Sequence, residues 1–191
     1  MVNRKPQTLR PWHTLRAQAV YDCRVFSVTE QRRRSPRTGD EHDFYVLEVP
    51  DWVNIIPLTA DRRVVMIYQY RHGIDGFTLE VPGGMVDSED LSPLEAARRE
   101  MREETGYDSD DVVPLGVIHP NPAIQPNRCH TFLARNVELR GSLSFDTTEE
   151  CEVALIPLEE IPELIRRGVI SHALVVVAFH HLLLSETDSK R

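Results

Sequence analysis

The chain has 191 residues, 41% of them hydrophobic and 27% charged, a length that fits one domain or one domain with a small annex. Its net charge of −8 argues against a general nucleic-acid or anionic-membrane binder, because both need a positive surface. Three cysteines without Cys-x-x-Cys spacing indicate neither a disulfide framework nor a zinc knuckle. No apolar stretch suits a signal peptide or a membrane span, so we expect a cytoplasmic protein.

The N-terminal region predicts an arm followed by a hairpin. Residues 1–19 show no clear period, so we expect an arm that either frays or docks through Trp12. Residues 23–30 and 42–49 alternate between apolar and polar around a turn-rich segment at 35–40, a pattern typical of a β-hairpin. The three arginines at 32–34 are expected to guard a strand edge rather than to bind nucleic acid.

The rest of the chain predicts strands interspersed with helices. Ser92 before Pro93, with Glu95 three residues after the serine, is a capping box that begins a helix over 93–104, and Gly106 ends it. Strands are expected at 53–58, 64–70, 78–81, 112–118, 129–134 and 151–156, and further helices at 161–167 and at 172–185 after a Ser171 cap. This order favours an α+β fold or an α/β/α sandwich.

Three carboxylates share one stripe of the predicted helix at 93–104. Helical rotation places Glu103 and Glu104 within about 60° of Glu100, beside the core-facing stripe. Two carboxylates ~5 Å apart repel by roughly 3 kcal/mol at an effective dielectric near 20, so a positive charge should compensate them. A hard divalent cation such as Mg²⁺ fits this role. The alternative is a solvated acidic face balanced by the neighbouring arginines.

Residues 83–107 resemble the Nudix box, whose pattern is Gly, five residues, Glu, seven residues, then Arg-Glu-apolar-any-Glu-Glu-any-Gly-apolar. The second half matches position by position from Arg99 onward. The first half departs from the pattern: five residues after Gly84 lead to Asp90, and eight residues, not seven, then separate Asp90 from Arg99. Counting from Gly83 leads instead to Glu89, with a longer gap. The loop therefore carries an insertion, and either acid could stand for the first glutamate of the box.

The resemblance implies a role for each acidic residue of the box. Glu100 and Glu104 correspond to the principal ligands of Mg²⁺, for which Mn²⁺ is a substitute. Glu103 corresponds to a further ligand or to a base that orients water. Gly83 is expected to offer its backbone carbonyl to a metal. The first acid of the box supports the loop through the box arginine.

Outside the box, the chain is similar to the ADP-ribose and nucleoside-diphosphate-sugar pyrophosphatase branch of the family. The similar segments are Gln69-Tyr70-Arg71, the run 79–84, and Pro120-Asn121-Pro122. The resemblance implies that Arg71 contacts phosphate, that Pro122 lies at the substrate, and that Glu80 hydrogen-bonds substrate or instead forms a loop-stabilising salt bridge. Glu150 is the favoured general base, ahead of its neighbours Glu149 and Glu152.

The resemblance implies an α/β/α sandwich with a mixed sheet over 51–191 and a small antiparallel β annex over 1–50 that is exchanged across a homodimer. The implied reaction is Mg²⁺-dependent hydrolysis of a nucleoside diphosphate sugar such as ADP-ribose, with a small-molecule substrate and no nucleic-acid or membrane partner. One alternative is a pyrophosphohydrolase acting on nucleoside triphosphates or RNA 5′ ends. Another, of a different class, is a non-catalytic Nudix domain that senses ADP-ribose.

Overall fold

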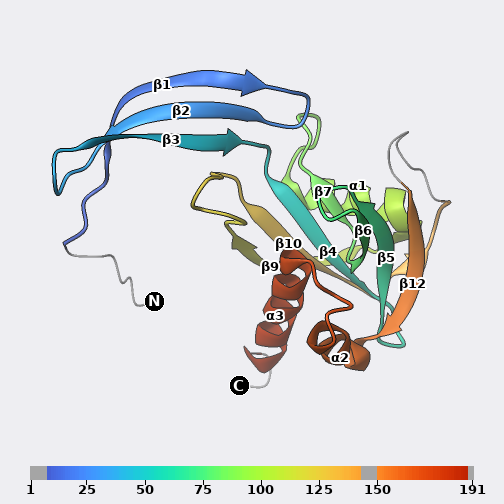
Figure 1. The fold of residues 1–191 in the computed structure, drawn as a ribbon. Coiled ribbons are helices and arrows are strands. Elements are labelled where there is room, and N and C mark those ends of the chain that lie inside the picture. Colours follow the sequence, from blue (N-terminus) through green and yellow to red (C-terminus); the bar gives the residue numbers. More distant parts are fainter. Residues whose placement is uncertain (1–7, 143–149, 189–191) are drawn as a thin grey trace. The chain divides into compact units, whose positions relative to one another are not determined.

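The computed structural model describes residues 8–142 and 150–188, and the chain divides into two compact units (Figure 1). The first unit consists of Met1–Val49 and Asn121–Asn127. The second consists of Pro50–Pro120 and Arg128–Arg191. Among the helices in the described ranges, none is long and apolar enough to cross a membrane.

The first unit is a three-stranded antiparallel sheet in the order β1-β2-β3, built from β1 (His13–Asp22), β2 (Ser27–Arg34) and β3 (Glu41–Glu48). The hairpin of β2 and β3 confirms the prediction. The expectation of an arm up to residue 19 is wrong from His13 onward, because those residues form a strand. All ten residues of β1 are exposed. Because neither face of the strand is buried, its sequence lacks the alternation of apolar and polar residues that would predict a strand. Trp12 contacts Phe44 edge to face, with ring centroids 5.2 Å apart.

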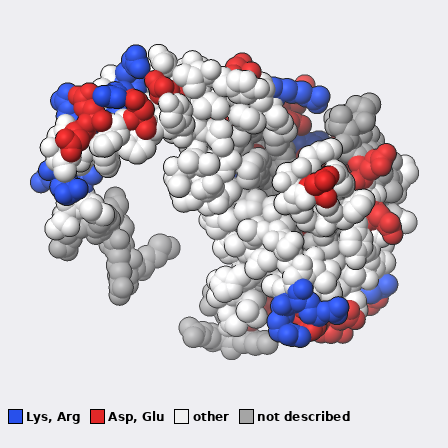
Figure 2. Space-filling view, in the orientation of Figure 1, with Lys and Arg blue, Asp and Glu red and all other residues white. Residues whose placement is uncertain are grey.

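The arginines at the end of β2 do not guard an edge, so that prediction is wrong. β2 is the central strand, and both of its sides are paired. Arg32 instead donates to Asp43 at 2.9 Å and Arg34 to Glu41 at 2.8 Å, both on β3. Figure 2 shows basic and acidic side chains next to one another over this sheet. Carboxylates of the adjacent strand therefore pair with two of the three arginines, whereas Arg33 donates to Gln31 on its own strand.

The second unit has a mixed sheet in the order β12-β5-β4-β10-β9. Its strands are β4 (Trp52–Leu58), β5 (Arg63–Arg71), β9 (Asp111–Ile118), β10 (Cys129–Arg135) and β12 (Cys151–Pro157), with β6 (Gly76–Glu80) beside β5 and β7 (Gly83–Met85) beside β4. β4 and β10 are parallel, and the other pairs are antiparallel. The predicted strands are confirmed. The short strands β7, β8 (Tyr107–Asp108) and β11 (Glu138–Leu139) were not predicted.

Helices cover both faces of this sheet, which confirms the α/β/α sandwich (Figure 1). On one face, α1 (Pro93–Thr105) packs Ala97 and Met101 against β4 and β10. On the other face lie η1 (Leu158–Glu160), α2 (Ile161–Arg166) and α3 (Ala173–Asp188). The last helix begins one residue later than predicted, after His172, and extends three residues further.

A divergence of two strands makes room for the Pro82-Gly83-Gly84 segment. β4 and β5 pair only at Leu58 and Val64. Beyond that point β5 pairs with β6 and β4 with β7. The Ile55 N–H donates to the Pro82 carbonyl at 2.9 Å, which fixes the connection between β6 and β7 in the gap. The sheet therefore holds this loop beside α1.

Candidate active site

Local chemistry fixes the helix that carries the acidic stripe. The Ser92 hydroxyl accepts a hydrogen bond from the Glu95 N–H at 3.3 Å, and Pro93 is the first helical residue. Gly106 ends the helix with a φ of 72°, and its N–H donates to the Arg102 carbonyl at 2.9 Å. The predicted start and end of the helix are both confirmed.

Two of the three box glutamates are buried. Glu100 is 8% exposed and Glu104 is 4% exposed, whereas the side chain of Glu103 is 43% exposed. The backbone N–H of Gly83 donates to Glu104 Oε2 at 3.0 Å, which ties the β6–β7 connection to the helix. A solvated acidic face is therefore excluded for Glu100 and Glu104. Burying carboxylates is costly unless positive charge or hydrogen bonds compensate them.

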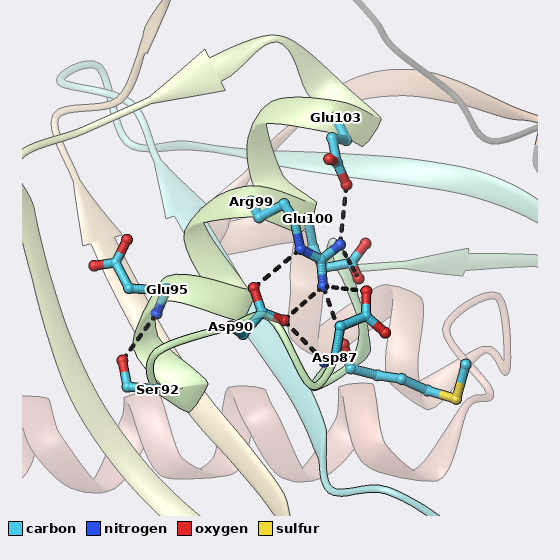
Figure 3. A network of polar contacts seen from close by, with 8 residues as sticks. Asp87, Asp90, Ser92, Glu95, Arg99, Glu100 and Glu103 are labelled. Carbon is cyan, nitrogen blue, oxygen red and sulfur yellow. Dashed lines mark hydrogen bonds and ion pairs between the residues drawn. The ribbon is translucent and has the colours of Figure 1, made fainter.

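Arg99 supplies part of that compensation (Figure 3). Its Nη1 donates to Glu100 Oε1 at 2.9 Å and to Glu103 Oε2 at 3.0 Å. Within the part of the chain that the structure describes, no group of three or more His, Cys, Asp or Glu side chains forms a ready-made metal cluster. The donor set nevertheless suits a hard divalent cation, because its oxygens come from carboxylates beside a glycine backbone. A cation there would replace the contacts that Arg99 makes.

Arg99 also shows which acid completes the box. Its Nε donates to Asp90 Oδ1 at 3.2 Å and its Nη2 to Asp90 Oδ2 at 2.9 Å, while Glu89 lies exposed. These bonds hold the pKa of Asp90 below its usual range. They also contribute most to raising the pKa of Arg99 above its ordinary value. The Asp90 N–H donates to the Asp87 carbonyl at 3.1 Å, so the longer loop folds back on itself and still delivers an acid to Arg99.

A second buried carboxylate network lies at the end of β6. Glu80 is 3% exposed and accepts hydrogen bonds from Arg71 Nε at 2.8 Å and Nη2 at 2.9 Å. The Thr78 hydroxyl also donates to Glu80, and His172 Nδ1 lies 2.7 Å from Glu80 Oε2. Burial by itself would raise the pKa of the Glu80 carboxyl. The hydrogen bonds from Arg71, His172 and Thr78 outweigh burial and hold this pKa far below its usual range.

Arg71 and Glu80 thus form an ion pair, the alternative that the sequence left open for Glu80. Sequence reasoning did not single out His172. No local signal could have done so, because 92 residues separate it from Glu80 and only the tertiary fold joins them. The substrate roles of Arg71 and Glu80 stay predictions.

The other predicted site residues are Glu150 and Pro122, with Glu149 and Glu152 as alternatives to Glu150. Glu150 is exposed and directly precedes β12, whose first residue, Cys151, donates from Sγ to the Glu104 carbonyl at 3.3 Å. Glu152 lies on the opposite face of the strand from Cys151, because side chains alternate along a strand. Pro122 is exposed in the segment of the first unit at 121–127. Glu149 lies outside the described residues.

Comparison with known proteins agrees with this arrangement. The NUDIX domain model matches residues 49–178. A CMP-5′-(N-acetyl-N-hydroxy-3-aminopropyl)phosphonate hydrolase of Streptomyces rubellomurinus is 31% identical over 149 residues, which cover 78% of this chain and 71% of that protein. An ADP-ribose pyrophosphatase of Bacillus subtilis is 25% identical over 142 residues, covering 74% and 76% of the two chains.

The fold also matches a known structure. The crystal structure of an ADP compounds hydrolase superposes with a TM-score of 0.85 at 22% identity and covers 96% of this chain and 98% of that one. At this identity the likeness shows the fold. The domain match and the Streptomyces relative show the family. The chain therefore belongs to the Nudix family and is a Nudix hydrolase.

Proposed function

We propose that this Nudix hydrolase cleaves the diphosphate bond of a nucleoside diphosphate sugar resembling ADP-ribose, giving a nucleoside monophosphate and a sugar phosphate. The observation that carries the proposal is the pair of buried carboxylates, Glu100 and Glu104, beside the Gly83–Gly84 backbone. The relative named as an ADP-ribose pyrophosphatase supports the substrate class. The ion pair of Arg71 and Glu80 supports it further, because Glu80 fixes the Arg71 guanidinium and lies three residues before that backbone.

Glu100, Glu103 and Glu104, with the Gly83 carbonyl, would hold the divalent metal, Mg²⁺ or in its place Mn²⁺. Such an ion neutralises charge on the phosphate oxygens and lowers the pKa of a bound water. Asp90 keeps Arg99 oriented beside these carboxylates.

The chain's own residues then position the substrate and move the proton. A carboxylate oxygen of Glu150, or of Glu103, accepts a proton from the attacking water. Arg71, oriented by Glu80, contributes positive charge toward the diphosphate. Pro122 lines the substrate in this proposal.

The first experiment is a substrate panel. Purified protein with Mg²⁺ is incubated with ADP-ribose, other nucleoside diphosphate sugars, dinucleoside polyphosphates and nucleoside triphosphates, and the products are identified. We expect AMP and ribose 5-phosphate in equal amounts from ADP-ribose. Release of pyrophosphate from triphosphates alone would contradict the substrate class and favour the alternative, a triphosphate or RNA 5′-end pyrophosphohydrolase.

The box glutamates are tested on the same helix. Glu100→Gln and Glu104→Gln should each lower kcat by about 10²–10³-fold, as expected when a group that stabilises transition-state charge is removed. Glu95→Gln is the matched control, because Glu95 lies in the first turn of α1 and outside the acidic stripe. Full turnover in both glutamine variants would overturn the metal role.

We also propose that residues 1–50 act as a β annex exchanged across a homodimer in the cytoplasm. Leu15, Tyr21 and Tyr45 on the three-stranded sheet are 43%, 56% and 56% exposed, which is unusual for large apolar side chains on one small sheet. Cys23, Cys129 and Cys151 carry thiols rather than disulfides, as expected in a reducing compartment. Light scattering of the full chain should give twice the 21.9 kDa mass. A monomer at micromolar concentration would contradict the exchange.

A further inference from the structure

The first turn of α3 is hydrogen-bonded to β4, the strand that pairs with the box glycines on β7. Asn54 on β4 donates from Nδ2 to the Leu174 carbonyl at 3.2 Å. Asn54 is also the register partner of Gly83, whose N–H donates to Glu104 at 3.0 Å. A short chain of contacts thus runs from the box helix through β7 and β4 to the start of α3. The residue directly before that helix, His172, is held at the edge of the site.

The Glu80 carboxylate orients the His172 ring. Both oxygens of Glu80 already accept hydrogen bonds from Arg71, so in the 2.7 Å contact His172 donates from Nδ1. In the neutral imidazole, Nε2 then carries a lone pair and accepts a hydrogen bond. The side chain is 35% exposed, and the described residues give it no polar partner besides Glu80. One ring nitrogen is therefore committed to the protein, and the other is available.

We propose that His172 binds substrate, with Nε2 accepting a hydrogen bond from a sugar hydroxyl of the nucleoside diphosphate sugar. A sugar hydroxyl can supply the hydrogen that a neutral Nε2 accepts, whereas an ionised phosphate cannot. The neighbouring Arg71 guanidinium suits the adjacent diphosphate. This inference rests on the proposed function. It adds to the proposed site a specificity residue that directly precedes α3.

Two variants of His172 distinguish the contact made by Nδ1 from the contact made by Nε2. The amide of His172→Asn reaches the position of Nδ1 and keeps the bond to Glu80, whereas the amide of His172→Gln reaches the position of Nε2 and keeps the substrate contact. His180→Asn is the control, because His180 is exposed on α3, the helix that His172 directly precedes. The measurements are KM and kcat for ADP-ribose, the inhibition constants of ribose 5-phosphate and AMP, and the melting temperature.

We expect His172→Asn to raise KM about tenfold, the value of one hydrogen bond, with kcat and the melting temperature close to wild type. The inhibition constant of one product, the half whose sugar is bound, should rise equally, and that of the other should not change. His172→Gln should keep KM within about threefold and melt at a lower temperature, because it loses the Glu80 bond.

Unchanged KM and inhibition constants in His172→Asn would overturn the inference, because they would show that the ring serves only to hold Glu80. An equal rise in the inhibition constants of both products would also overturn it. Such a result would mean that the substitution displaces other groups of the site and does not remove one hydroxyl contact. If wild-type protein does not hydrolyse any nucleoside diphosphate sugar, the proposed function fails and the inference fails with it. Wild-type turnover with an unaffected His172→Asn variant rejects the role of His172 alone.

Discussion

The Glu100 carboxylate lies directly against the backbone of Gly84: a Cβ at position 84 would stand 2.7 Å from Glu100 Cδ, inside the contact distance of real side chains. Gly84→Ala should therefore displace the carboxylate while the helix stays capped and packed. We expect kcat to fall by about 10²-fold, since a displacement of about 1 Å in a catalytic group has this effect. Steady-state kinetics with ADP-ribose measures it.

Gly73→Ala is the matched control for this prediction. Gly73 lies in the turn between β5 and β6, and a Cβ there would have no heavy atom within 4 Å. The control should keep wild-type kcat and melting temperature. Equal kcat values for the two alanine variants would show that the position of Glu100 is not set by Gly84.

Asp90 is expected to stabilise the box loop. Its side chain is 8% exposed and makes two hydrogen bonds to Arg99, so Asp90→Ala should lower the free energy of unfolding by about 2 kcal/mol, the range for hydrogen bonds to charged groups. Denaturant unfolding measures this loss. Glu89→Gln, one residue away and exposed, should have no measurable effect. A larger loss in the Glu89 variant would assign the box position to Glu89.

The sequence predicted the features that depend on local chemistry. Ser92, Pro93 and Gly106 set the bounds of α1, because capping and a left-handed terminal residue act within one helical turn. The box pattern predicted the buried side of that helix less well. Glu100 and Glu104 were expected beside the core-facing stripe, but both are buried together with Met101. Helical periodicity predicts the side of the helix on which a carboxylate lies. It does not predict which other segment of the chain covers that carboxylate.

Features that depend on distant pairing could not be predicted. β1 shows no alternation because it is exposed along its whole length, and the pairing on both sides of β2 became evident only when β1 was placed beside it. The choice between Glu89 and Asp90 depended on how the inserted residue is accommodated. The contact between Glu80 and His172 requires β6 and the start of α3 to meet across the fold.

Acid should weaken the Glu80 network. The folded-state pKa of Glu80 lies below its unfolded value, so its contribution to stability is fully present above about pH 5 and is lost as the pH falls toward the folded pKa. Below the unfolded pKa, this group steepens the fall of the unfolding free energy by up to about 1.4 kcal/mol per pH unit. Denaturant unfolding of wild type and Glu80→Gln between pH 7 and about pH 3 measures the slopes.

The unfolding free energy of Glu80→Gln should fall less steeply with decreasing pH than that of wild type, because the variant has no carboxyl to protonate at position 80. Glu159→Gln, which alters an exposed acid in η1, should reproduce the wild-type slope. Parallel curves for wild type and Glu80→Gln would mean that Glu80 has the same proton affinity in both states. The Arg71 and His172 bonds would then be absent in solution.

The proposed role of Glu150 as the general base can be tested by substitution. It directly precedes Cys151, whose thiol reaches the Glu104 carbonyl at the end of the box helix, so the backbone brings residue 150 to that end of the site. As the general base, Glu150→Gln should lower kcat by about 10²–10⁴-fold with KM nearly unchanged. Glu159→Gln is the control, because Glu159 is an exposed acid in η1, beyond the other end of β12. A decrease of only a few-fold in Glu150→Gln would transfer the role to Glu103, and a large decrease in Glu103→Gln would then be expected.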